Sequence, residues 1–298
     1  MDQESEVTFE FVSVIRQFKS GRVERLLPAN PAPPSVDAAT GVASKDVTID
    51  ATTGLWARLY LPPTKHRYSK SQRIGVPLPP ATNSSSADAD DKLAIVVYLH
   101  GGGFVAGSAA DAPEHAFLNR LCARARVLAV SVEYRLAPEH PVPACYDDAW
   151  TALRWAAAEA GTTADPWIRG RGDRARLFVV GKDQGLSEDQ LEELWAFACA
   201  ARTTGPDDPR VNPVADGAPS LRRLGCDRVL VCVAEDELGP RGKAYHDGLL
   251  ASGWAEEDAQ LLESAGEDHE FFLRDPGSAK ALLLMHRLMV AFLGAKNQ

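Results

Sequence analysis

Leu93–Phe104, LAIVVYLHGGGF, is the stretch of sequence that decides the fold class. The segment before the glycines is nearly all apolar, which is typical of a strand buried on both faces of a parallel sheet. Glycines directly after a strand allow unusual dihedral angles and close approach of the backbone to a ligand. A nucleotide phosphate loop is excluded, because no Gly-Lys-Ser/Thr follows and the pattern is not GxGxxG. We therefore interpret Gly101, Gly102 and Gly103 as an oxyanion hole, whose amides bind the negative oxygen of a tetrahedral intermediate.

The rest of the chain alternates between apolar runs and amphipathic segments. This alternation predicts an α/β fold with a mostly parallel central sheet and helices on both faces. In such sheets, catalytic groups collect at the carboxyl ends of the strands. We expect strands at 46–51, 55–61, 93–99, 127–132, 176–180, 228–234 and 260–263, and helices at 114–126, 147–160, about 240–252 and 278–293.

The organisation of the chain is expected to be a single domain over residues 1–298. Within residues 1–34, which we interpret as a lid-like segment, apolar side chains at helical spacing predict an amphipathic helix over 7–18. Residues 64–92 are rich in Ser, Pro, Asp and Lys without periodicity, so we expect a mobile surface insertion there. The residues that suggest the N-terminal helix are Phe11, Val14, Ile15 and Phe18.

Composition excludes several classes of protein. With a formal net charge of −9, the chain is a poor candidate for binding nucleic acid, which needs clustered Lys and Arg. No apolar run reaches the roughly 18 residues of a membrane span, and the acidic residues 1–6 do not look like a signal peptide. We therefore expect a cytoplasmic protein, with access to the nucleus left open. The 5 cysteines are scattered without a ligand pattern, so neither a metal nor another cofactor is implied.

A set of motifs points to a known family. Together they closely resemble the plant carboxylesterases of the hormone-sensitive-lipase-like branch of the α/β-hydrolase fold, to which the gibberellin-receptor relatives also belong. The resemblance runs from about residue 7 to about residue 295. The motifs are HGGGF (100–104), EYRLAPEHP (133–141), YDD (146–148), DPW (165–167), LGCDRVLV (224–231) and GEDH (266–269).

The resemblance implies an esterase with a Ser-His-Asp triad. His269, in a loop after the last short strand, takes the position of the general base. Asp236, after the strand at 228–234, matches the acid that orients the imidazole. Compared with the family pattern, the segment around Asp236 looks one residue shorter. Glu235 and Glu237 are therefore alternative candidates for the acid that orients the imidazole.

The nucleophile departs from the family pattern. The family carries Gly-Asp-Ser-Ala-Gly-Gly after the third buried strand, whereas this chain has Gly181-Lys182-Asp183-Gln184-Gly185. Asp183 therefore occupies the position of the nucleophile, and the amide of Gln184 that of a further oxyanion donor. Attack of a carboxylate on an ester carbonyl would give a strained mixed anhydride. The alternative is that GKDQG is a junction that keeps two glycines by coincidence.

The segment after the junction resembles a part of the family that lies far downstream, in the cap region. Residues 186–220 are therefore interpreted as a remnant of the cap. The chain is expected to lack the helix behind the nucleophile and the next central strand, more than the roughly 30 residues of one helix-strand unit. Ser187 stands three residues before Gln190, the spacing of a helix capping box. Ser108 and Ser131 do not follow a nucleophile strand, so both are interpreted as structural.

The sequence thus predicts a carboxylesterase-like hydrolase of small carboxylic esters, weakly active or inactive. Loss of the nucleophile costs on the order of a millionfold in turnover in serine hydrolases. The alternative is a non-catalytic protein that binds a small hydrophobic ligand, like the hormone receptors, although the persistence of His269 weakens this alternative. A product of an altered gene without an independent function is the third hypothesis.

Overall fold

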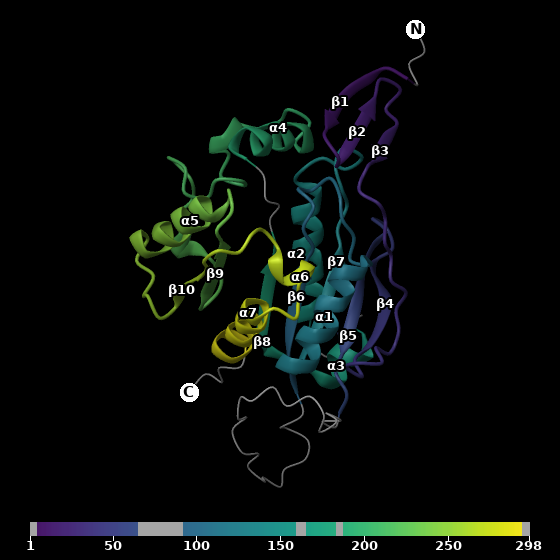
Figure 1. Cartoon of the computed structure of the whole chain (residues 1–298), viewed down its shortest axis with the longest axis vertical. Helices are drawn as coiled ribbons and strands as arrows, with labels where there is room; N and C mark the ends of the chain where they lie inside the picture. The colour runs from purple at the N-terminus through teal and green to yellow at the C-terminus, as the bar shows by residue number, and fades with distance from the viewer. Residues whose placement is uncertain (1–4, 65–91, 159–164, 183–186, 294–298) are drawn as a thin grey trace.

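The computed structural model describes residues 5–64, 92–158, 165–182 and 187–293. Its central sheet has five strands in the order β4-β5-β7-β6-β8 (Figure 1). β6 pairs in parallel with both β7 and β8, while β4 and β5 form an antiparallel hairpin that is also antiparallel to β7. The predicted α/β class with a central sheet is therefore confirmed. The described sheet is mixed rather than mostly parallel, because the hairpin of β4 and β5 joins it by antiparallel pairing. Its strands are β4 (Ala43–Asp50), β5 (Leu55–Leu61), β6 (Leu93–Leu99), β7 (Val127–Glu133) and β8 (Gly172–Gly181).

Helices cover both faces of this sheet because its central strands are apolar on both sides. Successive side chains of a strand point to opposite faces. In β6, Ile95 belongs to the core that includes helix α2 (Ala144–Ala157), whereas Tyr98 packs with helix α1 (Ala112–Ala125) in the core on the opposite face. Both side chains are fully buried. The run LAIVVYL is thus apolar at every position because both of its faces are covered.

The other helices are shorter than α1 and α2 and lie in the second half of the chain. No helix in the described part of the chain is long and apolar enough to cross a membrane. A π-helical turn over Leu288–Leu293 extends the last α-helix. The helices are α3 (Pro166–Arg171), α4 (Glu188–Ala198), α5 (Gly239–Ala251), α6 (Phe271–Arg274) and α7 (Ala279–Arg287), with single 3₁₀ turns at Gly205–Asp207 and Leu221–Arg223.

A second, two-stranded sheet stands apart from the first. β9 (Val229–Ala234) pairs in parallel with β10 (Ala259–Ser264), and α5 packs against them with its own small apolar core. Among the described strands, β8 pairs on one side only, with β6, and β9 pairs only with β10. The five-stranded sheet therefore ends at β8, where Val179 is 55% exposed.

The open edge of β8 is expected to promote self-association, because an unpaired strand edge with an exposed apolar side chain is a template for another chain. Val179→Lys places a charge there and should lower the apparent mass measured by sedimentation velocity at high protein concentration. Val12→Lys, at a 77% exposed turn position, is the matched control and should have no effect. A wild-type chain that stays monomeric at every concentration would contradict this expectation.

The helix predicted over 7–18 is wrong. The structure has an antiparallel sheet of β1 (Val7–Phe11), β2 (Ile15–Phe18) and β3 (Val23–Arg25) instead. Ser13 adopts a φ of 65°, which turns the chain between the first two strands. Apolar residues on either side of such a turn reproduce helical spacing over a short segment, so the pattern was ambiguous. Of the four side chains that suggest a helix face, Val14 is half-buried, and the other three are buried: Phe11, Ile15 and Phe18.

The other elements lie close to their predicted positions. β5 and β6 match their predicted ranges, and β8 begins four residues earlier than predicted, at Gly172. α2 begins directly after Pro143, three residues before the predicted start. The predicted insertion at 64–92 falls almost wholly on residues 65–91, which lie outside the described residues.

Candidate active site

The register of the strands brings several loops to one edge of the sheet. In the parallel pairs of β6, Leu99 is opposite both Val132 and Gly181, so the loops that follow β6, β7 and β8 begin side by side. In the second sheet, Ser264 is opposite Ala234, which places the loops after β9 and β10 together as well. The predicted site residues that the structure describes, Gly101, Gly102, Gly103, Asp236 and His269, lie in these loops.

The glycine loop after β6 is held by its own carbonyl groups. The Gly102 carbonyl accepts hydrogen bonds from the amides of Val105 and Ala106, both at 3.0 Å, and the Gly101 carbonyl accepts one from His100 Nδ1 at 2.8 Å. Gly102 has a φ of +130°, and a Cβ there would lie 1.9 Å from the carbonyl oxygen of Ala106. Only glycine fits this position, because a side chain would displace the backbone that it faces.

The amides of Gly102 and Gly103 face away from these carbonyl bonds. In a trans peptide, the N–H points opposite to the C=O of the preceding residue. Since the carbonyls of Gly101 and Gly102 bind within the loop, the N–H groups of Gly102 and Gly103 point to its other side. In the part of the chain that the structure describes, neither amide has a hydrogen-bond acceptor. Two such donors can bind an anion or a carbonyl oxygen.

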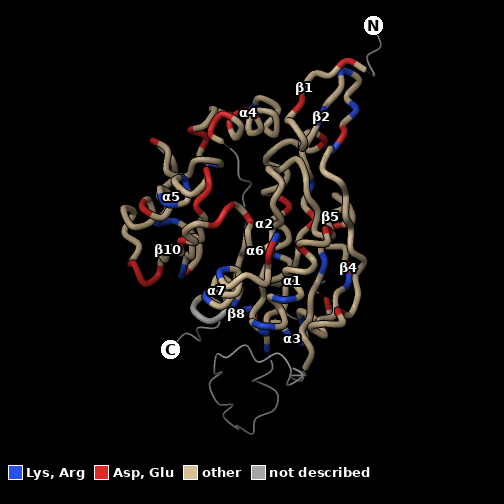
Figure 2. The backbone as a smooth tube through the Cα atoms, in the orientation of Figure 1, with Lys and Arg blue, Asp and Glu red and all other residues tan. Residues whose placement is uncertain are grey.

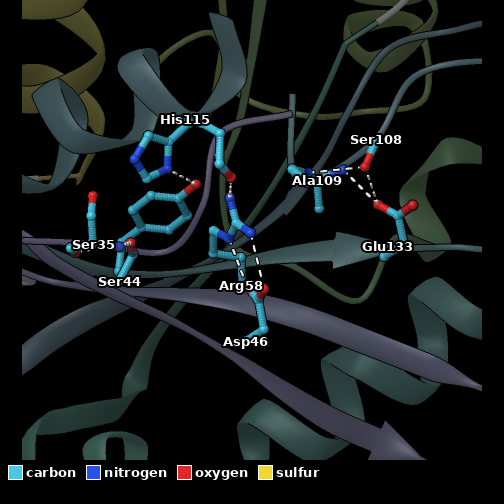
Figure 3. Close-up of polar contacts among 11 residues, drawn as sticks. Ser35, Ser44, Asp46, Arg58, Ser108, Ala109, His115 and Glu133 are labelled. Carbon is cyan, nitrogen blue, oxygen red and sulfur yellow. Dashed lines mark hydrogen bonds and ion pairs between the residues drawn. The ribbon is translucent and has the colours of Figure 1, made fainter. Parts of the chain in front are cut away.

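Glu133, at the end of β7, fixes the far side of the glycine loop (Figure 3). Its Oε2 accepts hydrogen bonds from Ser108 Oγ at 2.9 Å and from the Ala109 amide at 2.6 Å. Burial raises the pKa of this carboxyl group, although both hydrogen bonds act to lower it. In the same view, Arg58 of β5 forms an ion pair with Asp46 of β4, which joins these two neighbouring strands.

The N-terminal sheet is tied to the same loop. Arg25, the last residue of β3, donates from Nε to the Val105 carbonyl at 2.8 Å and from Nη2 to the Ala137 carbonyl at 3.2 Å. Its guanidinium also forms a bidentate pair with Glu139. The three strands before residue 26 are therefore fastened against the loop that follows the glycines.

His100 stacks on Tyr134 with 4.2 Å between ring centroids, and the Tyr134 hydroxyl donates to the His100 carbonyl at 2.8 Å. Only 3% of His100 is exposed. This burial lowers the pKa of His100 to about 4, with a further contribution from the Lys182 cation. The imidazole is therefore neutral at pH 7 and acts as a structural partner of the loop.

His269 and Asp236 are brought together, as the sequence predicted. His269 Nδ1 lies 2.9 Å from Asp236 Oδ2, and the Asp236 carboxylate is 9% exposed. Because a carboxylate can only accept hydrogen bonds, the proton between them belongs to Nδ1, and Nε2 is then the basic nitrogen of the neutral ring. This is the arrangement of a general base and its orienting acid.

The Asp236 carboxylate is oriented by the first turn of α5. Its Oδ1 accepts hydrogen bonds from the amides of Leu238 at 3.0 Å and Gly239 at 2.8 Å, which leaves Oδ2 for the imidazole. Glu235, one of the two substitutes left open by the sequence, binds the Gly266 amide at 2.6 Å instead. Asp236 thus binds the imidazole of His269, as the family pattern implies, whereas Glu235 does not take this role.

The predicted nucleophile position is not described: Asp183 and Gln184 fall within residues 183–186, outside the described part of the chain. The interpretation of Ser187 as a helix cap is confirmed, because α4 begins with a capping box formed by Ser187 and Gln190. Ser108 is bound to Glu133, as described above. Ser131 is fully buried within β7.

Three residues of this region were missed by the sequence analysis. Glu133 lies in the EYRLAPEHP motif, which in the sequence indicates only a family resemblance, and Arg25 lies in the segment after the predicted helix. In the sequence, Lys182 is distinguished only as part of the altered junction. Its two ion pairs, with Glu114 and Glu270, depend on contacts that no local pattern reveals. No group of three or more metal-ligating side chains occurs among the described residues.

Comparison with known proteins gives one consistent result. Residues 96–185 match the family model described as the alpha/beta hydrolase fold. Probable carboxylesterase 13 of Arabidopsis thaliana is 32% identical over 345 aligned residues, which cover 98% of this chain and 100% of that protein. Tuliposide A-converting enzyme b3 of Tulipa gesneriana is 36% identical and aligns with 93% of this chain and 77% of its own length.

Solved structures agree on the fold. The esterase LipW from Mycobacterium marinum superposes with a TM-score of 0.61 at 22% identity, covering 86% of this chain and 83% of the esterase.

The alignment with the Arabidopsis protein spans 345 residues, more than the 298 of this chain, so that protein carries residues without a counterpart here.

Proposed function

Because the chain belongs to the plant carboxylesterase family of α/β hydrolases, we propose that it is an esterase-like protein that keeps the base, the acid and the anion-binding amides but lacks the serine nucleophile. The observation that carries this proposal is the pair of His269 and Asp236, with 2.9 Å between Nδ1 and Oδ2, in a chain whose GxSxG position holds Asp183. The substrates of this class would be small carboxylic esters.

The base and acid have a defined role in ester hydrolysis. His269 Nε2 would take a proton from the attacking group and pass it to the leaving alcohol. Asp236 would hold the imidazole in the required tautomer and stabilise the imidazolium that forms. The amides of Gly102 and Gly103 would bind the oxyanion of the tetrahedral intermediate, with Gly101 and Gln184 as further candidates from the family pattern.

Absence of the segment that follows the nucleophile is supported by three observations. The match to the family model ends at residue 185, directly after the altered junction. The Arabidopsis relative carries residues that this chain lacks. The central sheet ends at β8 and pairs with no other described strand there, while β9 and β10 form a separate sheet. An absent strand between β8 and β9 accounts for all three.

The purified chain is therefore expected to hydrolyse short-chain nitrophenyl esters at a rate near that of buffer. Without a nucleophile, the base and the oxyanion hole leave about 10³-fold catalysis over water for the bound ester, and a catalytic amount of protein binds too little of the ester for this to exceed the hydrolysis in buffer clearly. Turnover should be measured with and without an organophosphate, and His269→Gln serves to show which part of any residual rate depends on the imidazole. Turnover that an organophosphate abolishes would contradict the proposal, because it requires a reactive serine.

Ligand binding without turnover is the second candidate function. It is favoured by Arg25, which fastens the N-terminal sheet against the glycine loop through the Val105 carbonyl and could couple that sheet to an occupied site. Calorimetric titration with non-hydrolysable ketone analogues of small esters tests it. Binding that Gly102→Ala abolishes would support a ligand-binding role, and absence of binding to any analogue would count against it.

A further inference from the structure

Lys182 links three parts of the molecule that are distant in sequence. It directly follows β8, and its Nζ lies 2.6 Å from Glu114 Oε1 at the start of α1 and 2.8 Å from Glu270 Oε1 in the His269 loop. In the parallel register of β6 and β8, Leu99 is opposite Gly181, and His100 and Lys182 directly follow this last pair. The cation therefore lies beside the first residue of the glycine loop.

The cluster is buried and tightly bonded. The side chains of Lys182 and Glu114 are 8% and 10% exposed, and that of Glu270 is 29% exposed. The second oxygen of Glu114 accepts a hydrogen bond from the Tyr98 hydroxyl at 2.5 Å. With the ammonium removed, two carboxylates would face each other in a region of low dielectric constant, which is unfavourable. Lys182 is thus the group that allows both glutamates to approach.

Glu270 connects the ion pair with Lys182 to the imidazole, because Glu270 is the next residue after His269. Its φ of 52° lies in the left-handed region, which is unusual for a residue with a side chain, so the surrounding contacts must hold it there. It also directly precedes the short helix α6, whose last residue, Arg274, donates a hydrogen bond to the His269 carbonyl. The ion pair with Lys182 anchors the side chain of this constrained residue.

We propose that Lys182 is a positioning residue that fixes the His269 loop relative to the glycine loop. The proposal rests on the proposed function, in which His269 is the base and the glycine amides bind the oxyanion. Lys182 acts through Glu270, because its ion pairs in the described part of the chain are with Glu114 and Glu270. Its two ion pairs join the end of β8 to α1 on one side and to the loop after β10 on the other. This connection lies where the described strands of the two sheets, β8 and β9, do not pair with each other.

The test follows the His269 Nδ1 proton in the full-length chain by NMR, with ¹⁵N-labelled histidine. A proton held between an imidazole and a carboxylate resonates far downfield and exchanges slowly with water, and its disappearance in His269→Gln assigns it. In Lys182→Met, we expect this proton to exchange at least about tenfold faster, because the loop opens locally. Backbone amides of β6 and β7 should exchange as in the wild type.

A second variant keeps the test decisive if Lys182→Met does not fold. Glu270→Gln removes only the partly exposed carboxylate and leaves Lys182 paired with Glu114. It should accelerate exchange of the His269 proton by the same factor, and the double variant should add nothing further, since both changes break one connection. Lys243→Met removes an exposed ion pair with Glu263 and is the matched control.

Two results would overturn the proposal. One is a His269 proton that exchanges at the wild-type rate in Glu270→Gln. The other is acceleration in Lys182→Met that is equal for His269 and for the β6 and β7 amides, which would indicate a purely structural role. Neither result depends on esterase activity. Failure of the proposed function, seen as organophosphate-sensitive turnover, is therefore distinguishable from failure of the positioning role.

Discussion

Asp183→Ser is expected to raise the turnover of short-chain nitrophenyl esters by about 10³-fold over the unaltered chain. The physical reason is that the remaining groups are expected to be competent: His269 is oriented by Asp236, and the amides of Gly102 and Gly103 have no hydrogen-bond acceptor among the described residues. The gain should stay below the roughly millionfold effect of a nucleophile in an intact triad. The helix that normally supports the turn around the serine is proposed to be absent.

The measurement is the initial rate of nitrophenyl acetate hydrolysis, with Asp183→Ala as the matched control. Asp183→Ala should remain at the background rate, which separates the gain of a hydroxyl from the loss of a carboxylate. Combining Asp183→Ser with His269→Gln should return the rate to background. A folded Asp183→Ser variant without any gain would contradict the claim that the base and the oxyanion site are intact.

Loss of stability in mild acid is the second large effect, and it arises from His100. Its pKa is about 4 in the folded chain, whereas an unfolded histidine titrates near 6.5. Between these values the unfolded state binds more protons, so the free energy of unfolding falls as the pH falls through this window. A shift of this size corresponds to about 3 kcal/mol lost by pH 4.

Urea unfolding at several pH values between 7.5 and 4.5 measures this effect. His100→Gln should flatten the decrease in the free energy of unfolding, because the buried imidazole is gone. The exposed His286 provides the control His286→Gln, which should follow the wild type. The comparison with variants is necessary because Glu133 acts in the opposite direction. Burial raises its pKa, so its contribution to the free energy of unfolding increases as the pH falls. Parallel pH profiles for the wild type and His100→Gln would contradict the assignment.

The sequence was most informative where one physical constraint dominates. β6 was predicted to the residue, because a strand covered on both faces must be apolar at every position. The N-terminal segment was predicted wrongly because it is short, and apolar residues around the turn at Ser13 mimic a helix face. Pairing between β1 and β2 depends on contacts that the pattern of one segment does not contain.

The candidate site shows the same division. The glycine loop and the His269 position could be identified from motifs, since backbone conformation and chain order fix both. The choice between Asp236 and its neighbours could not, because three acidic residues in succession look alike in sequence. Only the fold shows that Glu235 binds the Gly266 amide while Asp236 faces the imidazole. The ion pairs of Lys182 join residues far apart in the chain, and no local pattern predicts them.

Labelling with a fluorophosphonate probe, followed by peptide mapping, tests most directly whether this chain has lost its attacking serine. The probe forms a stable bond only with a hydroxyl group that is activated by a neighbouring base. We predict that no serine of the wild-type chain is labelled, and that Asp183→Ser becomes labelled at residue 183. Labelling of Ser187 or any other serine in the wild type, abolished by His269→Gln, would contradict the account.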